Sequence, residues 1–219
     1  MPLIKPEFNR IARFAPLIGL LIGLSQSIIW LLLSNNGWPR ESLVLIVLGI
    51  GGLATGGIHL DGLIDTADGI AAGKDKCLEA MRDSRVGAIG IQVFLLVIFF
   101  QIAALIKLGN SALFVIPIAA FWSRVAPLWA IEKFPYLHAN GLSKFHKKNW
   151  KGYLKEIKPS LLILILISSF LIFNSMEIEK AYSILICLVS GIIPAIIIPH
   201  LLGKMIGGHS GDSYGASVV

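Results

Sequence analysis

Three aspartates, Asp61, Asp65 and Asp68, stand at positions i, i+4 and i+7. At 3.6 residues per turn these positions lie within about 60° of one another, so one helix would present all three carboxylates on one face. Like charges this close are destabilising unless a cation lies between them. Carboxylates with few other ligands favour Mg²⁺, which commonly shares its coordination with substrate phosphates. The spacing therefore predicts a magnesium site, with a hydrated acidic helix end as the alternative.

A fourth aspartate, Asp83, would lie about 33 Å beyond Asp61 on a straight helix. Gly69 and Gly73 predict a break in that helix, which would let the chain return and add Asp83 to the same set of metal ligands. Basic residues surround it on the connecting segment: Lys74, Lys76, Arg82 and Arg85. Carboxylates for a metal and cations for phosphate oxygens are what phosphoryl transfer requires, because its catalysis is mostly positioning and charge neutralisation.

Further polar residues accompany this stretch. His59 would lie about 160° around the helix from the aspartate face, which favours a contact with substrate or a neighbouring side chain over the same ion. Arg124 stands inside an apolar run. It would either snorkel to the membrane interface or meet a phosphate or carboxylate inside the protein. Gly87 and Gly90 would serve equally for close backbone approach or for helix packing.

Two polar segments lie farther along the chain. Gly207–Ala216 is rich in glycine and contains His209 and Asp212, so it is either an ordinary tail or a substrate-binding loop. The segment 132–159 carries many lysines together with Trp150. It would face anionic lipid headgroups or help to bind an anionic substrate.

Six apolar stretches must position these residues. They are roughly Pro16–Leu33, Ser42–Ile58, Gly87–Ile106, Ser111–Ile131, Ser160–Phe173 and Ala181–Leu202. The 219 residues are 55% hydrophobic and only 15% charged, whereas a soluble domain is about 25% charged. Since about 20 apolar residues cross a bilayer as a helix, we expect an all-α, polytopic bundle of about six transmembrane helices, forming one integral membrane domain over residues 1–219.

The basic residues predict the orientation of that bundle. With the N-terminus inside, 15 Lys and Arg residues fall in inside segments and three in outside segments. Positive loops tend to remain in the cytoplasm. Both termini and the Asp-rich stretch, residues His59–Gly90, are therefore expected there. The net charge of +6 does not indicate nucleic acid, because no polar segment interleaves basic with aromatic residues. Cys77 and Cys187 have neither metal spacing nor a plausible pairing, and are expected to be reduced.

At these residues the chain resembles the cobalamin synthase family. The resemblance rests on PLIGLLIGL (Pro16–Leu24), GGIHLDGLIDTADG (Gly56–Gly69), MRDSRVGAIG (Met81–Gly90), SRVAP (Ser123–Pro127) and GGHSGDSYGA (Gly207–Ala216), in order along nearly the whole chain. It implies a bacterial-type inner-membrane enzyme that uses Mg²⁺. The enzyme would join adenosylcobinamide-GDP to α-ribazole or its 5′-phosphate and release GMP. The family pattern also predicts that this chain is trimmed at both ends.

The resemblance assigns roles that agree with the residue chemistry. Metal binding is expected at Asp61, Asp65, Asp68 and Asp83, with Asp61 and Asp83 catalytic and Asp61 the favoured proton acceptor. Substrate binding is expected at His59, Arg82, Arg85, Arg124 and Asp212. Membrane lipid and the two substrates are the expected partners, and a homo-oligomer remains open.

Two other functions remain as alternatives. DTADG (Asp65–Gly69) matches the start of the CDP-alcohol phosphotransferase signature, although the rest of that signature is missing. A cation transporter would use the aspartates as an ion site. It would, however, place them near the middle of a span rather than at a cytoplasmic helix end.

Overall fold

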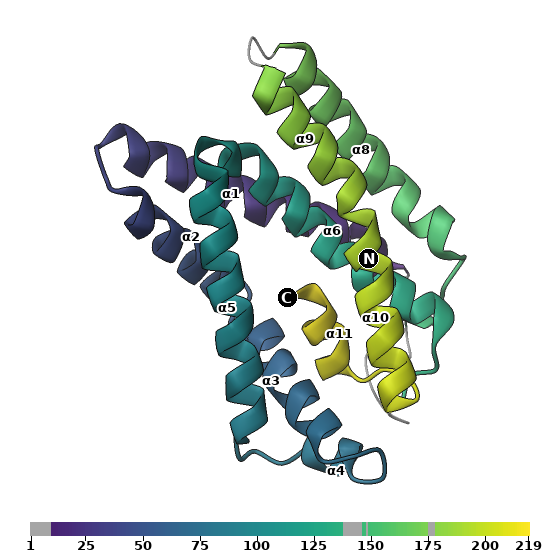
Figure 1. Ribbon diagram of the computed structural model, residues 1–219. Helices are drawn as coiled ribbons and strands as arrows, with labels where there is room; N and C mark the ends of the chain where they lie inside the picture. Colours follow the sequence, from purple (N-terminus) through teal and green to yellow (C-terminus); the bar gives the residue numbers. More distant parts are fainter. Residues whose placement is uncertain (1–9, 138–145, 148, 175–177) are drawn as a thin grey trace, which may run out of the picture.

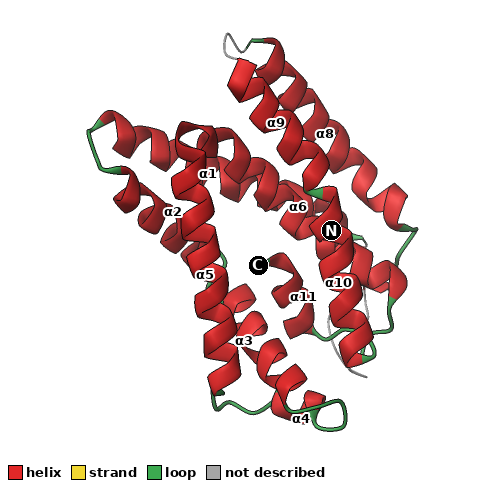
Figure 2. Ribbon diagram, viewed as in Figure 1, coloured by secondary structure: helices red, strands yellow, loops and turns green. Residues whose placement is uncertain are grey.

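The protein is a bundle of α-helices (Figures 1 and 2). The computed structural model describes residues 10–137, 146–147, 149–174 and 178–219, and no strand occurs in those ranges. The first part of the chain forms η1 (Ile11–Phe14), α1 (Ala15–Asn35), α2 (Arg40–Ala54), α3 (Ile58–Ala71), α4 (Cys77–Ala80) and α5 (Ala88–Leu108). The second part forms η2 (Gly109–Ser111), α6 (Ala112–Lys133), α8 (Tyr153–Phe173), α9 (Ile178–Ser190), α10 (Ile192–Ile206) and α11 (Gly211–Val218).

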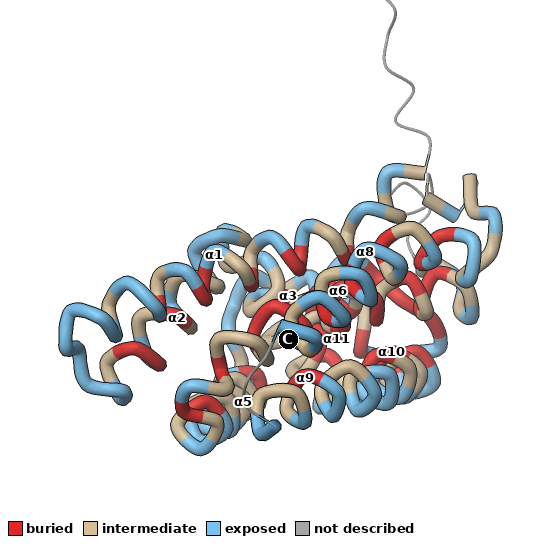
Figure 3. The backbone as a smooth tube through the Cα atoms, turned by 90° about the horizontal axis from the view of Figure 1, so that it is seen from above, coloured by how far each residue is buried: buried red, intermediate tan, exposed pale blue. Residues whose placement is uncertain are grey.

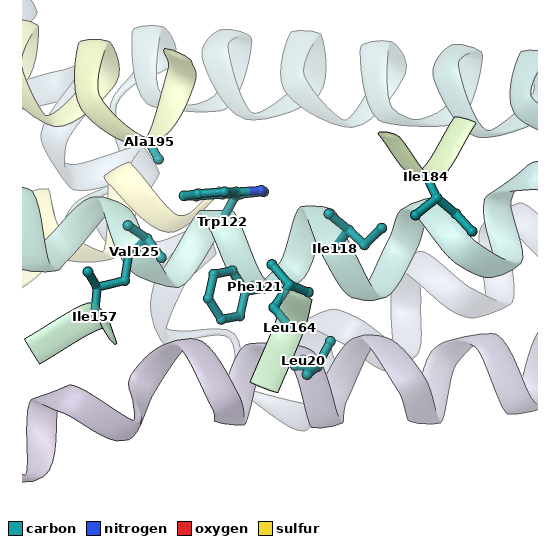
Figure 4. Close-up of a cluster of buried hydrophobic side chains, with 9 residues drawn as sticks. All are labelled: Leu20, Ile118, Phe121, Trp122, Val125, Ile157, Leu164, Ile184 and Ala195. Atoms are coloured by element: carbon teal, nitrogen blue, oxygen red, sulfur yellow. The ribbon is translucent and has the colours of Figure 1, made fainter. Parts of the chain in front are cut away.

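Helix α6 lies at the centre and packs against α1, α8, α9, α10 and α11. It is apolar on all sides, as expected of a helix buried among others. The main core is built around Phe121 and Trp122 of α6, whose rings meet edge to face with their centroids 5.5 Å apart. Apolar side chains of the surrounding helices pack against them (Figure 4). A Cβ atom at Gly23 of α1 would come within 2.5 Å of Pro117 Cα, so the small residue lets α1 and α6 approach closely.

The outer faces of the bundle expose large apolar side chains, including Phe99, Phe100, Phe170 and Phe173. Exposed positions, pale blue in Figure 3, lie along the outer sides of α1, α5 and α10. Four helical segments of the described chain are long and apolar enough to cross a membrane, or up to five if α2 and α3 count as one bent span. One of the four, Ala88–Lys133, has 46 residues and comprises α5, η2 and α6. The all-α membrane bundle is confirmed, whereas the expected number of six spans is not.

The chain turns sharply between α2 and α3, so the Asp-rich stretch does not simply prolong the second apolar stretch. The two helices are bent by 87° at a break that contains Gly56 and Gly57, whose φ angles are +61° and +74°. Only glycine adopts such angles readily. The break predicted after the Asp-rich helix lies at Gly73, with φ +85°, and not at Gly69. Gly69 lies within α3, where a Cβ atom would meet the side chain of Met81 at 2.4 Å.

Candidate active site

The Asp-rich helix α3 and the C-terminal helix α11 lie against each other (Figure 1). A Cβ atom at Gly62 of α3 would come within 2.6 Å of the Asp212 backbone oxygen, so Gly62 permits this contact. The packing brings Asp212 to the acidic face of α3, where Asp61, Asp68 and Asp212 are all close enough for their charges to act on Asp65. The structure therefore joins two acidic motifs that are separated by about 150 residues of sequence.

Asp61 and Asp65 form the open part of this face. Both belong to α3, as their spacing predicted, and Asp61 is exposed whereas Asp65 is half-buried. Within the described ranges, neither carboxylate takes part in a hydrogen bond or an ion pair. Two neighbouring carboxylates without partners can bind a cation or accept a proton, which are the two tasks expected of this face.

Asp68 has a different environment, although it lies on the same helix. Its Oδ2 atom accepts a hydrogen bond from the backbone N–H of Gly87, and its Oδ1 atom accepts one from the N–H of Gly90, both at 2.7 Å. Gly87 and Gly90 form the start of α5, so Asp68 links the end of one helix to the beginning of another. Both expected roles of these glycines are found here, since Gly90 also packs against Ile64 of α3.

Asp83 lies on the connection between α4 and α5 and is paired with Arg85. Arg85 Nη2 donates to Asp83 Oδ2 at 2.6 Å, and Arg85 Nε donates to Asp83 Oδ1 at 3.0 Å. These hydrogen bonds lower the pKa of Asp83 to about 2. Arg82 is exposed on the same connection. Asp83 is therefore engaged with an arginine, and the structure does not present it as a free fourth carboxylate.

His59 and Arg124 both line a mostly apolar cavity of about 360 Å³, formed by α1, α2, α3, α5, α6 and the end of α11. None of the aspartates lines that cavity. Arg124 is only 9% exposed, so its side chain lies inside the protein, and it has no ion pair with any described residue. His59 Nδ1 is likewise buried, with no hydrogen-bond partner in the described part of the chain. These two substrate-binding candidates therefore share a cavity that the aspartates do not line.

The glycine-rich segment after α10 is folded rather than loose. His209 is fully buried; its Nε2 donates to the carbonyl oxygen of Pro199 and its Nδ1 lies 2.9 Å from Ser213 Oγ. Ser210 and Ser213 form a capping box at the start of α11. His209 therefore serves the structure of this segment. We call the contacts of His209 together with the Ser210–Ser213 capping box the His209 clasp, and it holds α11, and with it Asp212, against α3. The sequence signal for this cap was Ser210, because serine is a preferred residue at the N-cap of a helix.

The four predicted metal ligands do not form one metal site in this structure. The described residues contain no group of three or more His, Cys, Asp or Glu side chains that could hold a metal ion together. A smaller site does fit, because Mg²⁺ commonly takes one or two carboxylates and completes its shell with water and substrate phosphates. The available pair is Asp61 and Asp65.

Comparison with known proteins agrees with this chemistry. The whole chain, residues 1–219, matches the family described as Cobalamin-5-phosphate synthase. The chain belongs to that family. A relative from Prochlorococcus marinus, named adenosylcobinamide-GDP ribazoletransferase, is 53% identical over 99% of this chain and 84% of its own length. A relative of the same name from Trichormus variabilis is 33% identical over 100% of this chain and 86% of its own.

No solved structure matches the chain. Membership of the cobalamin-5-phosphate synthase family makes this chain a transferase of cobalamin assembly, and the resemblance inferred from its motifs is confirmed. The apolar helices agree with a membrane enzyme. The individual site residues stay predictions, as does the magnesium ion.

Proposed function

We propose that this chain transfers the cobinamide-phosphate group of adenosylcobinamide-GDP to α-ribazole or its 5′-phosphate, giving adenosylcobalamin or its 5′-phosphate. The names of the relatives, adenosylcobinamide-GDP ribazoletransferase, support the two substrate classes. The observation that carries the proposal is the acidic face at the junction of α3 and α11, where Asp61 and Asp65 lack partners among the described residues while Asp212 lies opposite.

The reaction is a displacement at phosphorus. A ribose hydroxyl oxygen of the ribazole forms a bond to the cobinamide-linked phosphorus, and the bond from that phosphorus to the bridging oxygen breaks. GMP leaves with the bridging oxygen, and Asp61 accepts the proton of the attacking hydroxyl. A magnesium ion held by Asp61 and Asp65 would neutralise charge on the diphosphate.

The basic residues bind the anionic parts of the substrates. Arg82 and Arg85 lie on the connection between α4 and α5, and Arg85 is 88% exposed, which leaves its guanidinium accessible to phosphate oxygens. Its present partner, Asp83, shows that it can form a two-pronged contact with a pair of acidic oxygens. Arg124 and His59 contribute from the cavity that they line.

The proposed location is the inner membrane, with the acidic face and both termini in the cytoplasm. The excess of Lys and Arg in the inside segments supports this orientation. It also suits the proposed substrates, because a charged nucleotide would reach the acidic face from the water phase.

The decisive experiment measures GMP release from adenosylcobinamide-GDP by the chain in liposomes, with and without α-ribazole and Mg²⁺. We expect GMP only when all components are present, and no turnover of a CDP-alcohol. Consumption of a CDP-alcohol without GMP release would favour a CDP-alcohol phosphotransferase. Ion flux without either reaction would favour a cation transporter.

A further inference from the structure

The start of α5 has no cap of its own. The first N–H groups of a helix lack acceptors within the helix, and a side chain at the N-cap position usually accepts from one of them. Gly87 occupies the N-cap position of α5 and has no side chain to do so. The Asp68 carboxylate, 19 positions earlier, accepts from the N–H groups of Gly87 and Gly90 with one oxygen each.

Gly87 and Gly90 lack a Cβ atom, and this absence gives the Asp68 carboxylate the room it occupies. A Cβ atom at Gly87 would lie 2.3 Å from Asp68 Oδ1, 2.5 Å from its Cγ and 2.8 Å from its Oδ2, so all three nearest atoms belong to Asp68. A Cβ atom at Gly90 would lie 2.5 Å from Asp68 Oδ2, but also 2.7 Å from the backbone oxygen of Ile64. The closest conflicts of a side chain at Gly87 are therefore all with Asp68, whereas one at Gly90 also conflicts closely with the α3 backbone.

From this geometry we infer that Asp68 is a positioning residue and not a metal ligand. Its carboxylate caps α5 and thereby fixes both ends of the connection 72–87, which carries Arg82, Asp83 and Arg85. The physical reason is that the N-terminus of a helix is its positive end, which stabilises a carboxylate and disfavours a cation at the same oxygens. The hydrogen bonds are short and charge-assisted, as expected of a firm cap.

The inference deepens the proposed function by dividing the aspartates of α3 into two classes. Asp61 and Asp65 act on substrate and metal, whereas Asp68 acts through α5 on the arginines that bind phosphate. The capping role itself rests only on the structure. The effect on substrate binding rests in addition on the proposed function.

The first test compares double variants. Gly87→Ala and Gly90→Ala are each made in the wild-type chain and in Asp68→Ala, and thermal unfolding is measured in detergent. We expect Gly87→Ala to lower the midpoint in the wild-type chain, and most of that loss to disappear in Asp68→Ala, where the conflicting atoms are gone. Gly90→Ala is the matched control, and its loss should persist because the Ile64 carbonyl remains. Equal losses for Gly87→Ala in both backgrounds would overturn the inference.

The second test separates positioning from metal binding and uses Asp68→Asn, which keeps the shape of the side chain. Mn²⁺ affinity is measured by electron paramagnetic resonance without substrate, as a probe of the metal site. We expect Asp68→Asn to stay within about twofold of wild type and Asp61→Asn to lose at least about tenfold, the effect of removing a ligand or its close support. A tenfold loss in Asp68→Asn would contradict the inference.

Kinetics distinguish a positioning role from a loss of folded protein. Asp68→Asn should raise KM for adenosylcobinamide-GDP more than it lowers kcat, whereas partial unfolding lowers the apparent kcat alone. A change in kcat alone would count against positioning. If the wild-type chain releases no GMP and binds no Mn²⁺, the proposed function fails, and the unfolding comparison still decides the capping role.

Discussion

At the residue scale, the aspartates of the Asp-rich stretch are chemically identical but have different surroundings. Asp61 and Asp65 have no hydrogen-bond or ion-pair partner among the described residues. Asp68 is bonded to two backbone N–H groups, and Asp83 is paired with Arg85. Substitutions at these positions should therefore fail in different ways. Removing a partnerless carboxylate at the acidic face should impair chemistry, and removing a bonded one should impair structure.

Asp61→Ala should reduce GMP release by at least about 100-fold, since loss of a general base typically costs that much. Asp61 is exposed and has no described partner, so the variant should insert and unfold like the wild type. The measurement is turnover per folded molecule, with Asp75→Ala, an exposed aspartate between α3 and α4, as the control. Wild-type turnover in Asp61→Ala would remove this residue from the catalytic set.

Arg85→Lys should raise KM for adenosylcobinamide-GDP several-fold and leave Mn²⁺ affinity unchanged. A lysine keeps the charge but cannot reproduce the two-pronged contact of a guanidinium with acidic oxygens. The structure shows that contact with Asp83. The measurement is steady-state kinetics in liposomes, and an unchanged KM would argue against phosphate binding by Arg85.

At the scale of elements, the position of α11 depends on the buried His209. Its ring bonds to Pro199 of α10 and Ser213 of α11, and it stacks on Tyr214. The adjacent backbone also pairs with the segment after α6, since His209 N–H donates to Pro135 and Leu137 N–H donates to His209. His209 therefore fixes α10, α11 and the end of α6 relative to one another. Asp212 follows three positions later in the chain.

Acidification should loosen this clasp. Burial lowers the pKa of His209 from its ordinary 6.5 to about 4, so the folded state holds the neutral ring. Between pH 6.5 and pH 4 the unfolded chain binds the proton more readily, and this part of the stability is lost as the pH falls. We expect the unfolding midpoint in detergent to decrease over that range.

His209→Gln is the matched control for the pH experiment, because its amide can still donate to Pro199 without titrating. This variant should be less stable at neutral pH and should show a shallower dependence on pH. An identical pH dependence in both proteins would show that other groups, and not His209, cause the loss.

At the scale of the whole molecule, the apolar outer faces and the distribution of charge define how the bundle meets the membrane. Large apolar side chains are exposed along α5, α8 and α9, where lipid would cover them. Helix α3, which carries the acidic face, and the connection from it through α4 to α5 lie at one end of the bundle (Figure 1). We expect that end to face the cytoplasm.

Labelling of Lys74→Cys tests the orientation. Lys74 is exposed between α3 and α4, so the new thiol should react with a membrane-impermeant maleimide in inverted vesicles and not in intact cells. The background variant replaces Cys77 and Cys187 by Ala, and Arg40→Cys serves as the control for the opposite side. Labelling of Lys74→Cys in intact cells would reverse the topology.

The sequence by itself determined the class of the protein and the location of its chemistry. The high fraction of hydrophobic residues and the length of the apolar stretches predicted a helical membrane protein. A segment that crosses a bilayer must be long and apolar, and a helix hydrogen-bonds all of its backbone groups internally. The period of the helix placed Asp61, Asp65 and Asp68 on one face, and α3 confirms that arrangement. These features depend on local spacing, which a sequence shows directly.

Only the tertiary structure decided which of those aspartates has a free carboxylate. Asp68 meets Gly87 and Gly90 because α3 and α5 pack together, and Asp212 meets α3 because Gly62 lets α11 approach. Likewise, α2 and α3 are bent by 87° at their glycine-containing break, and Arg124 is buried at a cavity that no aspartate lines. Such contacts join residues far apart in the chain, and their geometry follows from how whole helices pack, which no local pattern encodes.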